Sequence, residues 1–170
     1  NGYITLPGGC RVGFCGSKSD SGWIKNVSSF NFRISRKIEN AASELYSIVL
    51  DQNKIHSSLI VGGPCSGKTT ILSDLAYFLS SNKFRVSIID ERGELAAVHN
   101  GIPQKSVGKM CDILDNYSKG EGMMIALRAL SPQALICDEI GTRTDVEMML
   151  EAMNAGVPVI SSAHSDGLKA

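Results

Sequence analysis

A short glycine-rich segment, residues 62–70, has the residue types and the spacing of a phosphate-binding loop. Gly62, Gly67, Lys68 and Thr69 fit the pattern G-x-x-x-x-G-K-[ST], the Walker A motif. Backbone N–H groups of such a loop form a concave anion site, and its glycines avoid a Cβ clash with the phosphates. The lysine contacts the β- and γ-phosphates, and the threonine hydroxyl ligates Mg²⁺. The segment therefore predicts a site for ATP and Mg²⁺. The residues assigned to nucleotide binding are Gly62, Gly63, Pro64, Cys65, Ser66, Gly67, Lys68, Thr69 and Thr70.

The sequence on either side of this segment agrees with that interpretation. Residues 59–61 are Leu-Ile-Val, which predicts a strand, and residues 71–79 are rich in apolar side chains and predict a helix. A helix that starts at the loop adds unpaired N–H donors and a positive dipole end to the anion site. The alternative is a chance match in a glycine-rich turn.

Two further predicted strands end in carboxylates. Residues 134–137 are followed by Asp138 and Glu139, the Walker B pattern, in which the aspartate holds Mg²⁺ and an adjacent glutamate orients or deprotonates the attacking water. Residues 85–89 are followed by residues 90–94, of which four are charged. Open α/β sheets bind ligands at the carboxyl ends of their strands. The alternative for residues 90–94 is a solvated strand end.

His164 follows another predicted strand, residues 157–161. This places it in the same register as Asp90 and Asp138, at the edge of the sheet where a site is expected. The alternative is a structural or surface histidine.

The first 34 residues predict short strands and turns. Residues 3–6 and 10–15 form a hairpin around Pro7-Gly8-Gly9, residues 16–22 form a polar loop, and residues 30–34 form a third strand. So short a piece cannot bury enough surface to fold alone, and we interpret it as the remnant of a small β-rich domain.

The remaining segments predict mainly helices. Residues 35–50 show helical periodicity and predict an amphipathic helix packed on the sheet. Residues 96–119 are irregular or weakly helical, and residues 120–130 predict a helix with one exposed cation, Arg128. Residues 143–153 predict another helix that Gly156 caps. Its expected core stripe is Val146, Met149, Leu150 and Met153.

Composition limits the classes of function. Of 170 residues, 17 are basic and 17 acidic, so no overall basic field favours nucleic acid as a partner. No apolar run reaches the roughly 18 residues that span a bilayer. The chain starts at Asn1 and stops at Ala170, which predicts that it is part of a longer protein. We expect a soluble, cytoplasmic fragment.

The five cysteines are scattered and odd in number, which is typical of reduced thiols rather than a disulfide framework. Cys10 and Cys15 could be a metal pair, but no second Cys/His pair stands at zinc spacing. We therefore expect buried or neutral thiols.

The order of these motifs resembles the secretion ATPases of the type II and type IV systems, which are RecA-like P-loop NTPases. Residues 89–94 resemble their Asp box, residues 127–132 the segment before Walker B, and residues 162–165 their His box. The resemblance implies an α/β fold with a mostly parallel sheet. It also implies an ATPase domain at residues 36–170, truncated at its C-terminus, after the last part of a β-rich N-terminal domain at residues 1–35.

Within that superfamily the chain is similar to the stage III sporulation protein AA family of endospore-forming bacteria. The similar runs are residues 2–6, 8–13, 90–92, 120–124 and 138–141. The last run reads Asp-Glu-Ile-Gly instead of the Gly-Glu-Ile-Arg-Asp common in secretion motors, which leaves the main general base open.

The resemblance also implies roles for individual residues. Lys68 and Thr69 bind phosphate and Mg²⁺, and Asp138 helps to hold the metal. Glu139 and Glu91 compete for the role of general base. His164 senses the γ-phosphate. Arg11 and Arg33 are candidates to neutralise transition-state charge, and the alternative for both is an exposed cation on a strand face.

The first functional hypothesis is an ATP-hydrolysing motor subunit. The resemblance implies a homohexameric ring, integral membrane proteins of a sporulation channel as partners, and a place at the cytoplasmic face of a membrane, on the mother-cell side of the forespore. A second hypothesis is a nucleotide-dependent assembly module with little turnover. A nucleotide or small-molecule kinase would need an arginine-rich lid, which residues 120–143 lack. A helicase is disfavoured by the neutral charge and the scarce aromatics.

Overall fold

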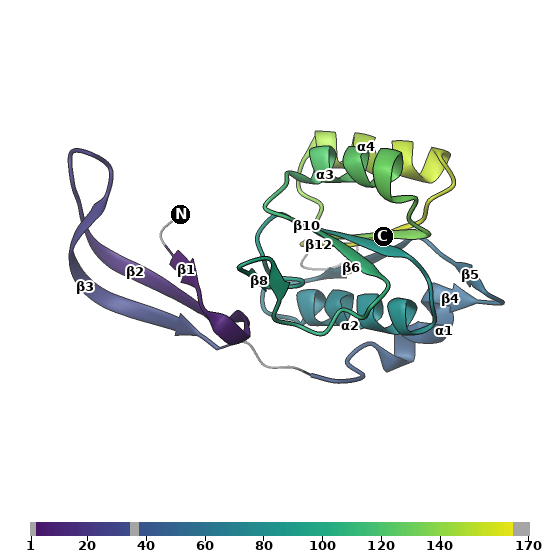
Figure 1. Cartoon of the computed structure of the whole chain (residues 1–170), viewed down its shortest axis with the longest axis horizontal. Helices are drawn as coiled ribbons and strands as arrows, with labels where there is room; N and C mark the ends of the chain where they lie inside the picture. Colours follow the sequence, from purple (N-terminus) through teal and green to yellow (C-terminus); the bar gives the residue numbers. More distant parts are fainter. Residues whose placement is uncertain (1–2, 35–37, 165–170) are drawn as a thin grey trace. The chain divides into compact units, whose positions relative to one another are not determined.

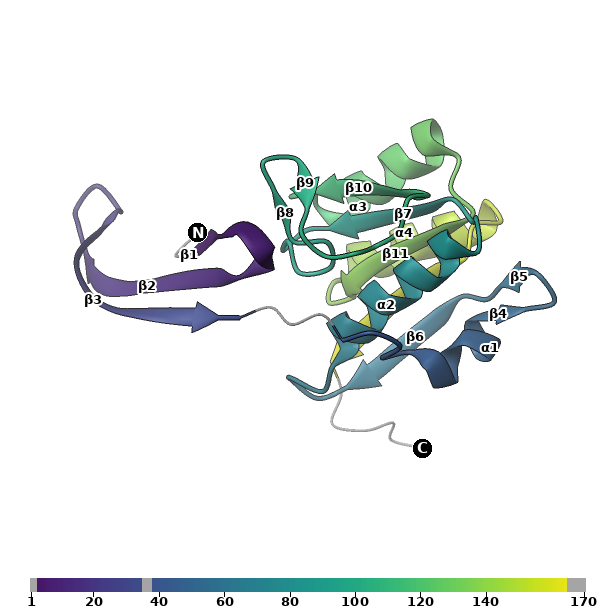
Figure 2. The ribbon, with the colours of Figure 1, turned by 60° about the horizontal axis from the view of Figure 1, so that its bottom comes forward.

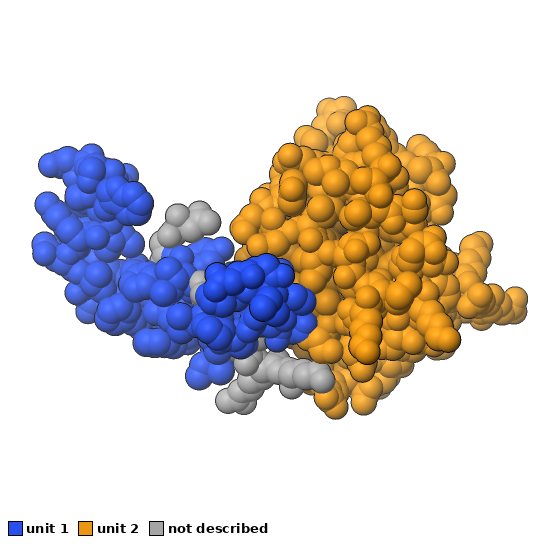
Figure 3. Space-filling view, in the orientation of Figure 1, with its two compact units in different colours: residues 1–37, 97–105 blue, residues 38–96, 106–170 orange. Residues whose placement is uncertain are grey.

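The computed structural model describes residues 3–34 and 38–164 of the chain. It divides the chain into two compact units (Figure 3). The smaller unit contains residues 1–37 and 97–105, and the larger unit contains residues 38–96 and 106–170. The boundary predicted between residues 35 and 36 lies outside the described residues, so the two-domain assignment stays a prediction.

The smaller unit is built on an antiparallel sheet with the order β1-β2-β3, formed by Tyr3–Thr5, Arg11–Lys18 and Ile24–Arg33. The predicted hairpin around Pro7-Gly8-Gly9 is confirmed, with a 3₁₀ turn at Pro7–Gly9. A second, short hairpin pairs β8 (Val98–His99) with β9 (Ile102–Pro103). Gly8 donates a hydrogen bond to Oε1 of Gln104, 2.7 Å away, which ties the two pieces of this unit together.

The polar loop predicted at residues 16–22 is shorter than expected. Strand β2 continues to Lys18, and β3 starts at Ile24 rather than at Phe30. The turn between them is closed by local hydrogen bonds, from Gly22 N–H to the Ser19 carbonyl and from the Ser19 hydroxyl to the carbonyl of Trp23. Strand β3 is exposed along its whole length, so it shows no alternation of buried and polar residues from which the sequence could reveal it.

The larger unit is organised around a five-stranded parallel sheet with the order β10-β7-β11-β12-β6. Its strands are β6 (Ser58–Gly62), β7 (Val86–Asp90), β10 (Cys111–Asp115), β11 (Ala134–Glu139) and β12 (Val159–His164). Helix α2 (Lys68–Ser81) covers one face, and α3 (Lys119–Ile125) and α4 (Arg143–Asn154) cover the other (Figures 1 and 2). This arrangement confirms the predicted α/β fold with a parallel sheet.

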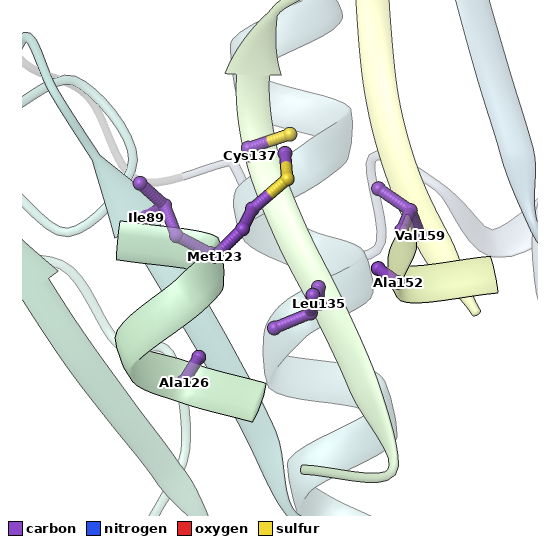
Figure 4. Close-up of a cluster of buried hydrophobic side chains, with 7 residues drawn as sticks. All are labelled: Ile89, Met123, Ala126, Leu135, Cys137, Ala152 and Val159. Atoms are coloured by element: carbon purple, nitrogen blue, oxygen red, sulfur yellow. The ribbon is translucent and has the colours of Figure 1, made fainter. Parts of the chain in front are cut away.

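The core beneath α3 and α4 is a cluster of fully buried side chains (Figure 4). Leu135 and Cys137 are two positions apart on β11 and therefore point to the same face of the sheet. The helices contribute Met123 and Ala152 to this cluster. Burying an apolar side chain of this kind contributes about 1.5–3 kcal/mol, so the cluster fixes both helices on the strands that carry the acidic residues.

The helix predicted at residues 35–50 is wrong over the part that the structure describes. That part has turns, a 3₁₀ turn at Ser43–Leu45, a four-residue α1 (Tyr46–Val49), and a small hairpin of β4 (Leu50–Asp51) and β5 (Lys54–Ile55). The reason is a tertiary contact. Asp74 of α2 accepts hydrogen bonds from Ala42 N–H (2.9 Å) and from the Tyr46 hydroxyl (2.5 Å), and the Tyr46 ring stacks on Phe78. Burial, and then the contact with Asp74, raise the pKa of Tyr46 to about 12.

Residues 96–119, predicted as irregular or weakly helical, contain strand β10, which lies at the edge of the main sheet and pairs in parallel with β7. Its sequence, Cys-Asp-Ile-Leu-Asp, mixes charged and apolar residues, because an edge strand is only partly buried. The pairing places Asp115 directly beside Asp90.

The helix predicted at residues 120–130 is confirmed as α3 followed by a π-helical turn, Ala126–Leu130, and Arg128 is exposed as expected. Helix α4 is also confirmed, but its predicted core stripe is largely wrong. Val146, Leu150 and Met153 are 45%, 54% and 44% exposed. The sheet side of α4 instead carries Asp145 and Ala152, which are buried, and between them Met148 and Met149, which are partly buried against the core, so Met149 is the one predicted stripe residue that packs there. In the part of the chain that the structure describes, no helix is long and apolar enough to cross a membrane.

Candidate functional site

The glycine-rich loop joins the end of β6 to the start of α2, as the sequence predicts. Two of its residues adopt left-handed backbone angles, Cys65 with φ 58° and Gly67 with φ 93°. A Cβ on Gly62 would come within 2.8 Å of Ser66 Oγ, so the loop turns back closely on its own start. Thr69 and Thr70 lie in the first turn of α2. The loop therefore has the tight curvature and the helix N-terminus that a phosphate cradle requires.

Lys68, the first residue of α2, is buried beneath this loop. Its Nζ donates hydrogen bonds to the carbonyls of Gly62 (2.8 Å) and Gly63 (2.7 Å), and lies 3.3 Å from Nδ1 of His164. His164 reaches the loop because β12 lies next to β6 in the sheet, with His164 and Gly62 as register partners. A residue 96 positions away in the sequence thus comes into contact with the lysine.

Glu139 continues this polar contact chain. Its Oε2 lies 3.3 Å from Nε2 of His164 and 3.4 Å from a guanidinium nitrogen of Arg92. The register of β11 with β12 shifts between Ile136 and Glu139, which aligns Glu139 with Ser162. Lys68, His164, Glu139 and Arg92 therefore form one continuous chain of contacts across the carboxyl ends of β6, β12, β11 and β7. Arg92 was not among the residues predicted for the site.

At the acidic end of β7, where ligand binding was expected, Asp90 instead has a structural role. Asp90 is fully buried, and its carboxylate accepts hydrogen bonds from the backbone N–H groups of Glu94 (2.7 Å), Leu95 (3.1 Å) and Ala96 (2.8 Å). From α2, the hydroxyl of Ser73 donates to the Leu95 carbonyl at 2.8 Å. Asp90 is thus the structural anchor of the loop formed by residues 91–96, and only part of this strand end is solvated.

Glu91 points to a partner that the sequence did not reveal. Its Oε2 lies 2.5 Å from Nζ of Lys119, a buried lysine at the first position of α3. Lys119 also lies 3.8 Å from Oδ2 of Asp145, at the start of α4. No local pattern distinguishes Lys119 from a surface lysine, because its burial depends on how α3 packs against the sheet.

Asp138, the predicted metal ligand, is buried at the end of β11. Burial raises the pKa of its carboxyl, and the negative charges of Glu94 and Asp90 raise it further, with partial compensation by Arg92. A cation near this carboxylate would relieve the repulsion. The Asp138 carboxylate and the Thr69 hydroxyl are oxygen donors of the kind that Mg²⁺ prefers. Among the described residues no group of three or more His, Cys, Asp or Glu side chains could hold a metal ion.

Arg11 and Arg33, the candidates for neutralising transition-state charge, belong to the smaller unit, on β2 and β3. They are register partners of each other, and the Arg11 guanidinium lies 4.7 Å from the ring centroid of Tyr3, a cation–π contact. Their assignment to catalysis stays a prediction.

The five cysteines are all free thiols, as expected. Cys137 is buried under α3 and α4, and burial raises its pKa to about 12; burial has the same effect on Cys111. Cys15 and Cys65 are exposed.

Solved structures with this fold define the class of protein. The chain superposes on the ATPase DotB of Legionella pneumophila with a TM-score of 0.62 and 18% identity, covering 94% of this chain and 43% of that one. It superposes on the pilus retraction motor PilT, solved with bound ADP, with a TM-score of 0.64 and 17% identity, covering 96% and 46%. The larger unit therefore has the α/β fold of the RecA-like P-loop NTPases, with a parallel sheet.

Sequence comparison then identifies the family within that class. A model of the family described as sporulation stage III, protein AA matches residues 1–170, and the chain belongs to this family. It is 43% identical to stage III sporulation protein AA of Bacillus subtilis (strain 168), over 96% of this chain and 56% of that protein. It is also 28% identical to the uncharacterized protein ycf45 of Cyanidium caldarium, over 84% of this chain and 42% of that protein. The chain thus spans about half the length of the curated relatives it matches.

Proposed function

We propose that the complete protein binds and hydrolyses ATP with Mg²⁺ and acts as a secretion-type motor subunit of a membrane-bound sporulation channel complex. The observation that carries this proposal is the contact chain from Lys68 through His164 to Glu139. It joins a phosphate-loop lysine to a carboxylate that could act on water, through a histidine placed between them. A loop that only binds phosphate does not need the second and third of these groups.

In this proposal the loop of residues 62–70 holds the phosphates through its backbone N–H groups and Lys68. Thr69 and Asp138 supply oxygen donors for Mg²⁺. ATP with Mg²⁺ supplies the γ-phosphoryl group that water attacks. His164 contacts both Lys68 and Glu139, so a shift of Lys68 on phosphate binding can move His164 and, through it, Glu139.

Glu139 is the better candidate for the general base. It lies in the contact chain with His164, whereas Glu91 is held 2.5 Å from Lys119 on the side of α3. That oxygen of Glu91 is therefore already in contact with an ammonium group. In the full-length protein, we expect Glu139→Gln to reduce ATP turnover by at least about 100-fold and Glu91→Gln to have a smaller effect. Equal losses in both variants would argue against this assignment.

The domain assignment, the assembly and the location rest on the family. We propose that residues 36–170 form the ATPase domain and residues 1–35 the last part of a β-rich N-terminal domain, with Arg11 or Arg33 stabilising transition-state charge. We propose a homohexameric ring at the cytoplasmic face of the membrane, on the mother-cell side of the forespore, in contact with integral membrane proteins of the channel. Nucleic acid is not an expected partner.

The decisive experiment compares ATP hydrolysis by the full-length wild type with the Lys68→Ala variant. We expect a loss of at least about 100-fold in the variant, because the lysine binds the phosphates whose charge grows in the transition state. Equal background rates in both proteins would refute the catalytic proposal.

A second candidate function, nucleotide-dependent assembly with little turnover, is favoured by one observation. One oxygen of Glu139, Oε2, contacts both His164 and Arg92, and these contacts compete with a water molecule for that oxygen. Measuring the mass of the full-length protein with and without ATP and Mg²⁺, beside its turnover, separates the two functions. A ring that forms with ATP and hydrolyses almost none of it would support the assembly module.

A further inference from the structure

A buried lysine, Lys119, lies behind the proposed site and has no role in the function described above. Its side chain is 10% exposed, and its Nζ lies between two carboxylates, 2.5 Å from Glu91 and 3.8 Å from Asp145. Removing an ammonium group from water is costly unless carboxylates compensate it, and here each of two separate segments supplies one. Lys119 therefore ties together three pieces of chain: the loop after β7, the start of α3 and the start of α4.

The first connection runs to the turn directly after Glu139. Asp145 Oδ2 accepts hydrogen bonds from the N–H groups of Gly141 (3.1 Å) and Thr142 (3.0 Å), and the Thr142 hydroxyl accepts one from Asp145 N–H (3.1 Å). This is a capping box at the start of α4. Burial raises the pKa of the Asp145 carboxyl, but these N–H groups and the charge of Lys119 outweigh it and lower the pKa overall. The Asp145 carboxylate thus holds the turn that follows Glu139, with Lys119 beside it.

The second connection approaches Glu139 from the other side. Glu91, the partner of Lys119, is followed in the chain by Arg92, whose guanidinium lies 3.4 Å from Oε2 of Glu139. The loop that carries both residues is fixed at its base by Asp90. Lys119 consequently constrains the segment that carries the cationic partner of Glu139 as well as the segment that leads away from Glu139.

The position of Lys119 is set by unusually close packing of α3 on β7. A Cβ added to Gly122, one helical turn after Lys119, would lie 2.7 Å from Cγ2 of Ile89, the residue before Asp90. Residues three apart in a helix share a face, so the contact that brings Gly122 onto β7 also brings Lys119 to the end of that strand.

We infer that Lys119 is a positioning residue for Glu139, which it aligns through Glu91–Arg92 on one side and through Asp145 and the turn at Gly141 and Thr142 on the other. This inference rests on the proposed function insofar as it assigns Glu139 a part in ATP turnover. The mechanical link from Lys119 to the Gly141–Thr142 turn does not depend on turnover and can be measured separately.

The test uses the full-length protein with Lys119→Met, Lys119→Arg and, as a matched control, Lys109→Met. Lys109 is exposed and precedes the amino end of β10, whereas Glu91 follows the carboxyl end of β7, the parallel neighbour of β10. For Lys119→Met we expect kcat for ATP to fall by about 10- to 100-fold with KM within about twofold, because a misplaced group costs rate rather than substrate binding. Lys119→Arg should keep most of the rate, and Lys109→Met all of it. An unchanged kcat in a folded Lys119→Met protein, or a rise in KM alone, would overturn the inference.

Amide hydrogen exchange in the nucleotide-free protein is the readout that does not depend on activity. Gly141 and Thr142 N–H should exchange at least about tenfold faster in Lys119→Met than in the wild type, while amides in the middle of β11 keep their protection. Unchanged exchange at both amides would overturn the link. If Lys119→Met does not fold, the double variant Lys119→Met/Glu91→Gln removes one of the two carboxylates left unpaired. It should show the same faster exchange at Gly141 and Thr142, and exchange at the wild-type rate would count against the inference.

The proposed function and the mechanical link can fail separately. If the wild type shows no turnover above that of Lys68→Ala but the exchange pattern is as expected, the proposed function is refuted and the link remains.

Discussion

Two loops at the same edge of the sheet are held in place in opposite ways. The loop of residues 62–70 includes the end of β6, and its own residues determine its shape. Gly67 adopts a left-handed conformation, Gly62 lies close to Ser66, and helix α2 begins at Lys68. The loop of residues 91–96 follows β7, and one buried carboxylate, Asp90, fixes it by accepting hydrogen bonds from three of its backbone N–H groups.

The difference teaches which kind of loop a sequence reveals. Backbone conformations that only glycine adopts easily leave a pattern at fixed spacing, which can be read without a structure. A loop tied by one carboxylate leaves no such pattern, because every residue except proline can donate its backbone N–H group. The predictions below test this contrast, from the largest expected effect to the smallest.

Removing the Asp90 carboxylate, which accepts hydrogen bonds from three N–H groups of the second loop, should have the largest effect. Asp90→Ala leaves three N–H groups without their acceptor, two of them on the buried residues Leu95 and Ala96. Because each unsatisfied donor costs about 1–3 kcal/mol, we expect the free energy of unfolding to fall by about 3–5 kcal/mol. Chemical denaturation measures this loss. Asp90→Asn keeps one acceptor oxygen and should lose less; a loss below about 1 kcal/mol in Asp90→Ala would show that the loop has another anchor.

A pair of glycines in α3 tests whether the region behind the second loop also depends on tertiary contact. Gly122→Ala places a methyl group 2.7 Å from Ile89, and overpacking of this kind costs about 1–3 kcal/mol. Gly120→Ala, in the same helix, places its Cβ 3.4 Å from the Met148 side chain and 3.9 Å from that of Thr144, and its gain in helix propensity should leave stability unchanged or slightly higher. Thermal unfolding of the two variants measures the difference. Similar midpoints would mean that α3 can shift away from β7 without cost.

In the first loop, substitution of Gly67, the glycine with positive φ, should reduce stability. Gly67→Ala forces a Cβ into the left-handed region and should cost about 1–2 kcal/mol, together with a weaker affinity for ATP. Gly63 has no atom within 4 Å of an added Cβ and no left-handed angle, so Gly63→Ala is the control for stability. Denaturation and binding of a fluorescent ATP analogue measure the two effects. Equal stability of both variants would contradict the claim that local conformation holds this loop.

The smallest expected effect concerns Asp138, whose pKa is raised in the folded protein by burial and by the nearby carboxylates. A raised native pKa means that the folded state holds the proton more tightly than the unfolded state. The contribution of this group to stability is therefore favourable at low pH and is lost as the pH rises from about 3.8 through the native pKa. At pH 7 without Mg²⁺, Asp138→Asn should raise the midpoint of thermal unfolding by about 2–4 °C. This gain should shrink towards pH 4, and a gain independent of pH would contradict the assigned cause.

Much of the site could be predicted because its residues stand at strand ends. Strand periodicity and the motifs at residues 62–70 and 138–139 were sufficient to predict Lys68 in the loop, the pair Asp138 and Glu139, and His164 at the end of a strand. The structure brings Lys68, His164 and Glu139 into contact, since parallel strands present their carboxyl ends at one edge.

Other parts could not be predicted, and each has a physical reason. Arg92 and Lys119 are charged residues without a local motif, and only packing gives them partners. Residues 38–50 have helical periodicity, yet the Asp74 carboxylate accepts hydrogen bonds from Ala42 N–H and the Tyr46 hydroxyl, and these contacts prevent a long helix. Helix α4 has a regular apolar stripe, but the side that packs on the sheet carries Asp145, Met148, Met149 and Ala152, of which only Met149 belongs to that stripe.

The sequence by itself determined four of the five strands of the main sheet, the helices α2, α3 and α4, the phosphate-type loop and the family, because these depend on local conformation, on periodicity and on motifs. Only the tertiary structure decided how the site is assembled. It places β12 between β6 and β11, the Glu139 carboxylate next to His164, and the Glu91 carboxylate next to Lys119. Those choices depend on the burial of charges, and the cost of burying a charge is set by neighbours that are distant in the chain.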